Sequence, residues 1–409
     1  MDFLFSPSLY SASTGCDSGI DLLVNDTFSR VYDQAISWKP DDGYFHDRVG
    51  AAIFYRMPHL LSLGRDLSKM NAVEIGCGRG TKAVCWAQLF KSYTGVDVDE
   101  NLVREATEFA QRTKSGNVQF LAANAADVLA RPSQFGIEGK IDCIIIYAVM
   151  EHLTLEERES VLRSCRDVLE GHGLLIVCEA PNRLARDDDH SSQLPFFQSL
   201  PHKLATRYLA RSQRSEARDL AGCSEERLYR FGAGVSYHEF DLFLEDRDGN
   251  LPAVISGGWD MWPAFDEPVY PRDVELQEYF AINRVPAHSS FSRYWIDVIF
   301  DFSKPQSSRA DARGFIGVGS VVPGAPFVIK EPASARFMQL DIARSVGEFE
   351  IVSDRGSESA HSVDRLASSH FKRYHSRVQL DLSGLKDRPW LEIRPQRGSL
   401  TVVDGIVTG

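Results

Sequence analysis

A short glycine-rich segment around residue 76 is the strongest sign of chemistry in the sequence. Apolar residues flank Glu74, and glycines then occupy alternating positions at Gly76, Gly78 and Gly80, with Cys77 between the first two. Glycine lets a backbone turn sharply and approach a ligand without a clash at Cβ. The pattern predicts a buried strand, a loop that faces a ligand and a helix. Alone it is weak evidence, because glycine turns follow many strands.

An acidic residue follows at a spacing that suits a nucleoside. A second apolar segment ends in Asp97, about 20 residues after the first, where a carboxylate can accept hydrogen bonds from both hydroxyls of a ribose. The glycine spacing departs from the dinucleotide pattern G-x-G-x-x-G. The loop also lacks the lysine of a P-loop, so a nucleoside triphosphate is disfavoured.

Three histidines are candidates for a general base. His152 follows the expected fourth strand, His190 follows the acidic run 187–189, and His238 enters an expected strand. An imidazole near its ordinary pKa can accept the proton of an alcohol, which is a poor nucleophile at neutral pH. Each also has a plainer interpretation: a turn residue, a solvated loop residue and a satisfied strand histidine, respectively. The acids at 187–189 with His190 could hold a divalent ion, but acidic loops are usually solvated, and no metal is predicted.

The elements that must position these residues alternate between strand and helix. Apolar runs predict strands around residues 71–77, 92–97, 117–123, 141–149 and 173–181, with amphipathic helices between them. Such alternation predicts a doubly wound, Rossmann-like α/β sheet with crossover helices. Two later strands, 235–244 and 294–302, would complete seven strands with a terminal hairpin. Residues 1–70 form a partly helical region, whose segment 51–63 would cover one edge of the sheet.

The last hundred residues have a different character. Short strand signals separated by Gly, Ser and Pro predict a β-sandwich-like domain over 306–409. That segment carries 14 basic and 12 acidic side chains, whereas the acidic excess of the chain lies before it. We therefore predict two domains, 1–305 with a cap at 182–293, and 306–409. The basic run 372–377 would suit an anionic sugar or, more commonly, a solvated strand edge.

Composition excludes several classes of protein. The net charge of −12 disfavours nucleic acid as a partner. No apolar run approaches the length of a membrane span, and the first residues lack the features of a secretory signal. Cysteines fall inside expected strands, helices or the glycine loop without metal-ligand spacing, as in a reducing compartment; these are Cys77, Cys85, Cys143, Cys165 and Cys178. A soluble, cytoplasmic protein is expected.

Four ordered segments resemble the class I S-adenosylmethionine methyltransferases. They are VEIGCGRG, YTGVDVDE, AANAADV and IDCIIIYAVMEHL. The resemblance covers residues 45–180 well, 181–305 loosely and 306–409 not at all. It implies a methyltransferase with S-adenosylmethionine as cofactor. The residues implied to bind that cofactor are Glu74, Gly76, Cys77, Gly78, Gly80, Asp97, Val98, Asn124, Ala125 and Tyr147. Asn124 departs from the acid usual in the family, although its amide oxygen can still accept a hydrogen bond.

A second resemblance concerns the acceptor. The segment PNR…H…LPF after the fifth strand is similar to a branch found among bacterial proteins that modify cell-surface polysaccharides. Aromatic residues suited to stacking on sugar rings, or simply to a core, follow at Trp259, Trp262, Phe291, Tyr294 and Trp295. The main hypothesis is O-methylation of a sugar hydroxyl on a glycan or glycolipid precursor. The alternatives are a small-molecule or natural-product O- or N-methyltransferase, and a non-catalytic cofactor-binding subunit. The β-domain could dock a partner or a second copy of the chain.

Overall fold

The computed structural model describes most of the first 306 residues. The described residues are 26–61, 63, 65–257, 276, 279, 280, 283, 285 and 287–306, with the backbone of short strands between 319 and 408. Trp259, Trp262 and residues 372–375 lie outside them. None of the helices in the described part of the chain is long and apolar enough to cross a membrane.

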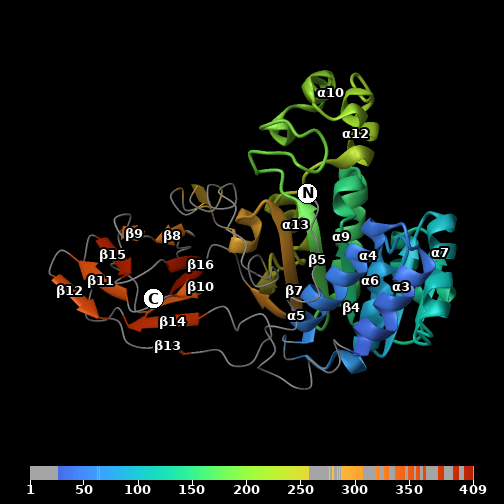
Figure 1. Ribbon diagram of the computed structural model, residues 1–409, viewed down its shortest axis with the longest axis horizontal. Helices are drawn as coiled ribbons and strands as arrows, with labels where there is room; N and C mark the ends of the chain where they lie inside the picture. The colour runs from blue at the N-terminus through green and yellow to red at the C-terminus, as the bar shows by residue number, and fades with distance from the viewer. Residues whose placement is uncertain are drawn as a thin grey trace.

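A seven-stranded sheet of order β3-β2-β1-β4-β5-β7-β6 forms the centre of the molecule (Figure 1). Strands β1 to β5 are parallel, and β7 runs antiparallel between β5 and β6. The doubly wound, Rossmann-like sheet predicted from the sequence is therefore confirmed. The strands are β1 Asn71–Ile75, β2 Ser92–Asp97, β3 Val118–Ala122, β4 Cys143–Tyr147, β5 Leu174–Pro181, β6 Leu251–Gly257 and β7 Trp295–Gln306.

The direction in which successive strands are added to the sheet reverses beside the glycine loop. The chain moves outward from β1 through β2 to β3, and then returns to the other side of β1 with β4. At such a switch point the loops after the two strands diverge, which opens a site at their carboxyl ends. The loop after β1 carries Gly76 to Gly80, and the turn after β4 carries Glu151 and His152. The two groups of residues are thus brought to one edge.

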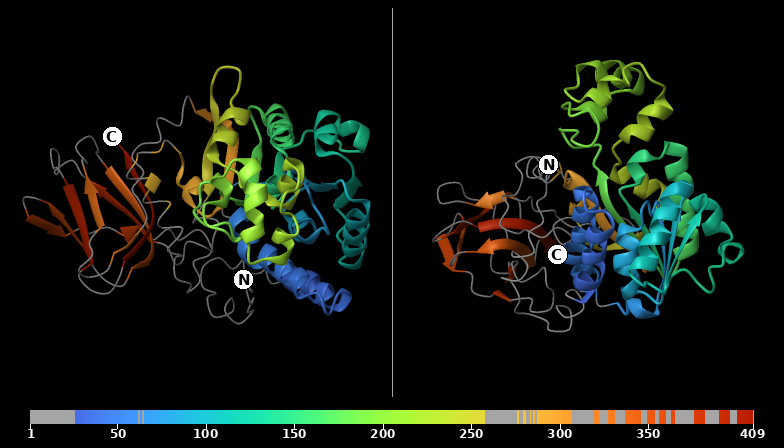
Figure 2. Two further views of the ribbon diagram at one scale, coloured as in Figure 1. Left: turned by 90° about the horizontal axis from the view of Figure 1, so that it is seen from above. Right: turned by 45° about the vertical axis from the view of Figure 1, so that its right-hand side comes forward.

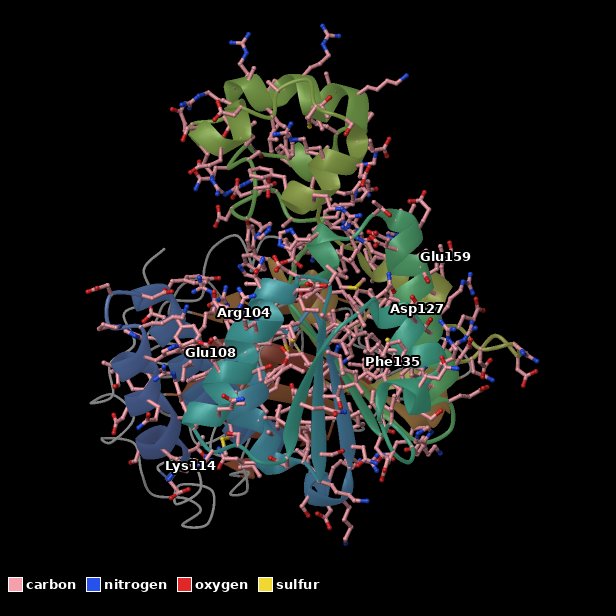
Figure 3. The ribbon with its side chains drawn as sticks, turned by 90° about the vertical axis from the view of Figure 1, so that its right-hand side faces the viewer. Arg104, Glu108, Lys114, Asp127, Phe135 and Glu159 are labelled. Atoms are coloured by element: carbon pink, nitrogen blue, oxygen red, sulfur yellow. The ribbon has the colours of Figure 1, made fainter. Side chains whose placement is uncertain are left out.

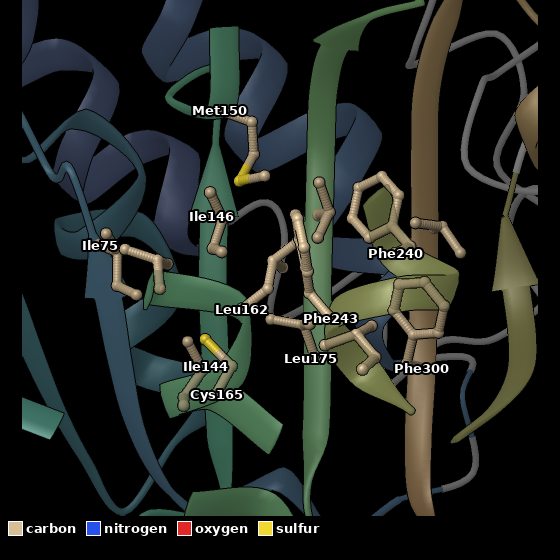
Figure 4. Close-up of a cluster of buried hydrophobic side chains, with 14 of the residues drawn as sticks. Ile75, Ile144, Ile146, Met150, Leu162, Cys165, Leu175, Phe240, Phe243 and Phe300 are labelled. Atoms are coloured by element: carbon tan, nitrogen blue, oxygen red, sulfur yellow. The ribbon is translucent and has the colours of Figure 1, made fainter. Parts of the chain in front are cut away.

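Helices cover both faces of the sheet. Figure 2 shows the helices on the two sides of the sheet. One buried cluster joins the sheet to the N-terminal helices, α6 and α7. The other cluster joins it to α8, α9 and α13 (Figure 4). Figure 3 shows the polar residues Arg104, Glu108, Asp127 and Glu159 on the outside of this layer. The helical elements are η1 Phe28–Tyr32, α3 Asp33–Trp38, α4 Gly43–Ala51, η2 Ala52–Arg56, α5 Met57–Leu61, η3 Leu67–Lys69, α6 Thr81–Trp86, η4 Ala87–Leu89, α7 Glu100–Arg112, α8 Ala125–Ala130, η5 Pro132–Phe135, η6 Met150–His152, α9 Leu155–Leu169, η7 Phe197–Ser199, α10 His202–Tyr208, η8 Leu209–Arg211, α11 Ser215–Arg218, α12 Glu225–Gly232, α13 Tyr237–Leu244 and η10 Ser289–Ser292.

Segment 51–63 covers a face of the sheet. The sequence-based prediction that it covers an edge is therefore wrong. Ile53, Met57 and Leu60 are buried in the same cluster as residues of β1, β4, β5 and β7. The apolar spacing of this segment continues that of α4, so the two helices bury one continuous stripe. The five cysteines expected to be buried are all buried and free.

The prediction of a strand at 235–244 is wrong. Residues 237–244 form the helix α13, which packs against α9. Ser236 and Glu239 form a capping box, and Phe240, Phe243 and Leu244 follow at helical spacing on the buried side. The sixth strand is instead β6, a segment that begins beside Pro252 and ends in Gly257.

The cap predicted at 182–293 contains α10, α11 and α12, which stand above the carboxyl edge of the sheet (Figures 1 and 3). It has a small apolar cluster of its own, built around Phe197, Leu209 and Leu228. The first of these helices, α10, spans His202–Tyr208. The cap also includes α13 and β6, so part of it belongs to the sheet layer.

The C-terminal strands form two antiparallel sheets, coloured orange and red in Figure 1. Their orders are β13-β14-β10-β16-β8 and β12-β11-β15-β9, which agrees with the all-β, sandwich-like region expected there. The division into domains at residue 305 stays a prediction; β7 itself continues to Gln306. These strands are β8 Gly319–Val321, β9 Phe327–Lys330, β10 Phe337–Ser345, β11 Phe349–Ser353, β12 Gly356–Ser359, β13 Val363–Asp364, β14 Ser376–Asp381, β15 Trp390–Pro395 and β16 Leu400–Thr408.

Candidate functional site

The glycine loop is tied directly to the end of β2. The amides of Gly76 and Cys77 donate to the carbonyl of Val96, at 2.7 and 3.1 Å. The Gly78 amide donates to Asp97 Oδ2 at 2.9 Å. Asp97 Oδ1 accepts from the Asp99 amide at 3.0 Å. The carboxylate is thereby fixed beside the loop, and its remaining lone pairs can accept hydrogen bonds from the hydroxyls of a ligand.

Gly76 and Gly78 both have positive φ, of +68° and +52°, but their surroundings differ. A Cβ on Gly76 would lie 2.3 Å from Cγ2 of Val149, in the turn after β4. A Cβ on Gly78 would meet no atom of the described residues within 4 Å. Gly76 is therefore required for the contact between the two loops, whereas Gly78 leaves the space beside the loop open.

This difference predicts opposite outcomes for two alanine variants. Gly76→Ala should lower the free energy of unfolding by about 2–5 kcal/mol, because a clash adds to the cost of a left-handed residue. Gly78→Ala should lower it by only about 1–2 kcal/mol. If the open side faces the cofactor, Gly78→Ala should nevertheless weaken cofactor binding. Chemical denaturation and calorimetric titration of both variants measure the two effects; equal losses of stability would contradict the interpretation.

Glu74 lies beneath the loop and not at its surface. Its side chain is fully buried, Oε2 accepts from the Tyr93 hydroxyl at 3.0 Å, and Oε1 has no partner among the described residues. Burial raises the pKa of Glu74 to about 7, and Lys82 opposes that shift. The prediction that Glu74 acts on a ligand is compatible with this position only through the loop backbone or through movement of the side chain.

The other predicted cofactor residues line the neighbouring strand ends. Val98 follows Asp97 and is 75% exposed, although it is large and apolar, as a residue under an adenine would be. Asn124 is exposed and caps α8, because its Oδ1 accepts from the Ala126 amide at 2.9 Å. Ala125 is half-buried. Tyr147 is buried and donates its hydroxyl to Glu179.

The turn after β4 holds a buried carboxylate beside a histidine. The side chain of Glu151 is fully buried, and neither of its oxygens has a hydrogen-bond partner among the described residues. His152 Nε2 lies 3.9 Å from Glu151 Oε1, and His152 Nδ1 bonds the carbonyl of Arg230 at 3.0 Å. Burial raises the pKa of Glu151 to about 8 and lowers that of His152.

His190 joins this group from the loop after β5. Its ring centroid lies 5.3 Å from that of His152 and 5.8 Å from that of Trp295, which it meets edge-on. Burial, together with the nearby His152, lowers the pKa of His190 to about 4. Gly232 makes room for the ring, since a Cβ there would lie 2.4 Å from His190 Cδ2. His152 and His190, far apart in the sequence, thus form one pair.

His238 and the acidic run 187–189 lie in other surroundings. His238 lies on α13, stacks on Tyr237 and bonds the Ser236 hydroxyl. Asp188 is buried, and its oxygens accept hydrogen bonds from the amides and hydroxyls of Ser191 and Ser192. The acidic run therefore shapes the loop that presents His190. The described ring contacts of His238 do not include the other two histidines.

Arg158 of α9 holds the turn after β4 in place. Its fully buried guanidinium donates to the carbonyls of Met150, Leu153, Ala233 and Gly234 and to Glu239. These bonds join the turn that carries His152 to the start of α13. They occupy the guanidinium, which is hence not the partner of Glu151.

Replacing Arg158 by methionine should lower the free energy of unfolding by about 3–5 kcal/mol, because Glu239 and the carbonyls lose a buried partner. Arg163→Met is a matched control on the same helix. Arg163 pairs with Glu159 at the surface, so its loss should change stability by less than about 1 kcal/mol. Urea denaturation of both variants decides; similar small changes would refute the role given to Arg158.

Sequence reasoning missed a charged network at the end of β5. Glu179 pairs with Arg48 and accepts from Tyr147, and its amide donates to Asp297 at 3.0 Å. Arg56 bonds Asp297 at 3.0 Å. Although burial raises the pKa of Glu179, Arg48 and Arg56 together lower it. The residues of this network come from four segments that are far apart in the sequence. The only signal in the sequence is Glu179, an acid inside the otherwise apolar strand β5.

Comparison with protein families places one domain. Residues 72–173 match the model described as a methyltransferase domain. The match runs from β1 to the residue before β5, and so contains the glycine loop, Asp97 and the Glu151–His152 turn. No curated protein matches the chain.

Solved structures resemble parts of the chain. One is PKMT2 from Rickettsia typhi in complex with AdoHcy, with 15% sequence identity and a TM-score of 0.36. That similarity covers 65% of this chain and 58% of the other chain. A second is a SAM-dependent methyltransferase from Anabaena variabilis, with 17% sequence identity and a TM-score of 0.32. That similarity covers 46% of this chain and 66% of the other chain. A third is magnesium protoporphyrin IX methyltransferase from Synechocystis with bound SAH, with 20% sequence identity and a TM-score of 0.24. That similarity covers 43% of this chain and 66% of the other chain. The chain spans about half to two thirds of the structures it matches.

Proposed function

We propose, from the premise that residues 72–173 form an S-adenosylmethionine-dependent methyltransferase domain, that the protein methylates a hydroxyl group of a sugar in a glycan or glycolipid precursor. The observation that carries the proposal is the pair His152 and His190, which lies with Glu151 at the carboxyl edge of the sheet. The glycine loop, which follows β1, and Asp97, the last residue of β2, lie at the same edge.

The residues at the switch point fit the cofactor. Gly78 leaves its side of the loop open, Asp97 is fixed with free lone pairs, and Val98 presents an exposed apolar surface. When bound, S-adenosylmethionine supplies a methyl group on a positively charged sulfur. The chain's residues then have to hold the acceptor atom about 3 Å from that carbon and exclude water.

The imidazole pair favours an oxygen acceptor. A hydroxyl needs help to lose its proton, whereas an unprotonated amine does not. His152 and His190 are both held in the neutral form by burial, since the pKa of each is lowered. A neutral imidazole has a lone pair that can accept a proton or bind an ion, but a lowered pKa makes it a weaker base than an ordinary histidine. Of the three histidines considered as bases, His152 and His190 therefore remain, and His238 is set aside.

The surroundings of the pair suit a carbohydrate. Trp295 is half-buried beside His190, while Phe291 and Tyr294 are core residues. An indole face exposed at a catalytic edge can stack on the C–H face of a sugar ring. In the cap above it, Phe196 is 59% exposed and has positive φ. A strained, exposed aromatic residue is more common at binding sites than elsewhere.

The proposal is tested by mass-spectrometric screening of acceptors with the purified full chain and S-adenosylmethionine. Oligosaccharides, nucleotide sugars, glycolipids and small amines or phenols would be compared. A gain of one methyl group on a sugar oxygen supports the proposal. Methylation confined to amines or to non-sugar small molecules would reject the sugar acceptor while leaving the methyltransferase domain intact.

The β-rich region 306–409 enters the proposal as a holder of the glycan, or as a docking module, in a cytoplasmic enzyme. Deleting it should raise KM for a long glycan and leave the turnover of a short acceptor unchanged. Equal kinetics on both acceptors before and after deletion would reject the glycan-holding role.

A further inference from the structure

Glu151 is a buried carboxyl group that no cation of the described residues hydrogen-bonds, although the charges of Arg158 and Lys82 act on it. Its side chain is fully buried, both oxygens lack hydrogen-bond partners among the described residues, and the guanidinium of Arg158 is committed elsewhere. Burying an unpaired carboxylate is expensive unless a cation or proton accompanies it. A group of this kind favours a positively charged partner.

Two imidazole nitrogens face the same point. The ligand atoms of Glu151, His152 and His190 all lie within 4.8 Å of one another. The Nδ1–H of His152 donates to the carbonyl of Arg230, which leaves the lone pair of Nε2 on the side of Glu151. A backbone carbonyl that fixes the second nitrogen in this way is the usual support of a metal-binding histidine.

We propose that Glu151, His152 and His190 bind a divalent transition-metal ion, and that this ion activates the acceptor hydroxyl. The first part stands on the geometry alone, and the second rests on the proposed function. An ion about 2.1 Å from each ligand needs the ligand atoms roughly 3–4 Å apart. The three ligand atoms, which lie within 4.8 Å of one another, would have to move closer together when the ion binds.

The ligand set selects the kind of ion. Two imidazoles with one carboxylate, leaving positions open, suit Zn²⁺, Fe²⁺, Co²⁺ or Mn²⁺. Mg²⁺ and Ca²⁺ prefer all-oxygen sites and are disfavoured. Of the three ligands, His152 is 43% exposed, so an acceptor oxygen would approach the ion from the side of this residue.

An ion here would replace an imidazole base. Coordination lowers the pKa of the acceptor hydroxyl, whose proton leaves to solvent. The oxygen then forms a bond to the methyl carbon with its own lone pair. The pair of the breaking sulfur–carbon bond stays on sulfur, which becomes a neutral thioether, so charge and atoms balance.

Metal binding can be measured without any substrate. The full chain would be freed of metals with EDTA, dialysed, and titrated with Zn²⁺ by calorimetry and with Co²⁺ by visible absorption. We expect one ion per chain, and at least about 100-fold weaker binding in Glu151→Gln and His190→Ala, since losing a ligand costs more than losing a supporting residue. His172→Ala, a histidine that bonds the backbone of Glu170 and Ile141, should bind like the wild type.

Thermal unfolding separates loss of a ligand from loss of the fold. Glu151→Gln should be about as stable as the metal-free wild type, because a neutral amide of similar size replaces a buried carboxyl group whose oxygens have no hydrogen-bond partner among the described residues. Zn²⁺ should raise the Tm of the wild type and not that of Glu151→Gln. Absence of Zn²⁺ and Co²⁺ binding, or equal binding by all variants, would overturn the site.

Different experimental outcomes would reject the activation of the hydroxyl by the ion and the proposed function. If the ion binds but EDTA leaves methyl transfer unchanged, the ion does not activate the hydroxyl and an imidazole base does. If S-adenosylmethionine does not bind, the proposed function fails, whatever the outcome of the metal titration. Restoration of activity by Co²⁺ or Mn²⁺ and not by Mg²⁺ would support both parts of the inference.

Discussion

Replacing Asp97 by alanine should weaken S-adenosylmethionine binding by about 100- to 1,000-fold. The carboxylate is positioned by the amides of Gly78 and Asp99, and two hydrogen bonds from ribose hydroxyls to a charged acceptor contribute about 1.5–3 kcal/mol each. Because each 1.4 kcal/mol is a tenfold change in Kd, a loss near the lower end of this sum gives the expected range. Calorimetric titration of the variant measures it.

Asp99→Ala is the matched control, since it removes the same charge two residues away. Asp99 caps α7 by accepting from the amides of Asn101 and Leu102. Its loss should cost about 1 kcal/mol of stability and change Kd by less than about threefold, or 0.7 kcal/mol. If the two variants weakened binding equally, the effect would belong to charge or to loop stability, and the direct ribose contact would be wrong.

His190→Ala should lower kcat by about 10²- to 10⁴-fold, the usual contribution of a group that assists proton removal. The ring lies in the His152 pair beside Trp295, so the effect is expected whether it accepts the proton or binds an ion. Cofactor affinity should be unchanged, because the loop after β1 and Asp97 are untouched. Single-turnover kinetics on an identified acceptor measures the loss.

The same assay ranks the three histidines named from the sequence. His152→Ala should resemble His190→Ala, whereas His238→Ala should remain near the wild type, because His238 lies on α13 against Tyr237. Near-wild-type rates for all three would reject activation by histidine. A large loss in His238→Ala alone would show that the wrong pair has been assigned.

The sheet could be predicted from the sequence because its strands are local apolar runs. β1, β4 and β5 are buried on both faces, so periodicity and length alone identify them. The glycine loop and Asp97 could be predicted for a similar reason, because a backbone turn at the end of a strand depends on a few residues that are close together in the sequence. α13 was mistaken for a strand because its aromatic residues outweighed a capping signal at Ser236 and Glu239.

The acceptor side could be predicted only in part. The sequence names His152 and His190 as separate candidates, but their pairing depends on how the loop after β5 folds back. Asp188 shapes that loop through Ser191 and Ser192, and Gly232, distant in the sequence, leaves room for the His190 ring. The unpaired state of Glu151 depends on Arg158 being bonded elsewhere. The Arg48–Glu179 and Arg56–Asp297 pairs join residues more than a hundred positions apart. No local pattern carries such information.

Calorimetric titration of the purified full chain with S-adenosylmethionine tests the central claim, the cofactor site at the switch point between β1 and β4. The account predicts saturable binding of one cofactor per chain, lost or strongly weakened in Asp97→Ala and retained in Asp99→Ala. No heat of binding for a folded wild-type chain, confirmed by the absence of any rise in Tm with the cofactor, would contradict it.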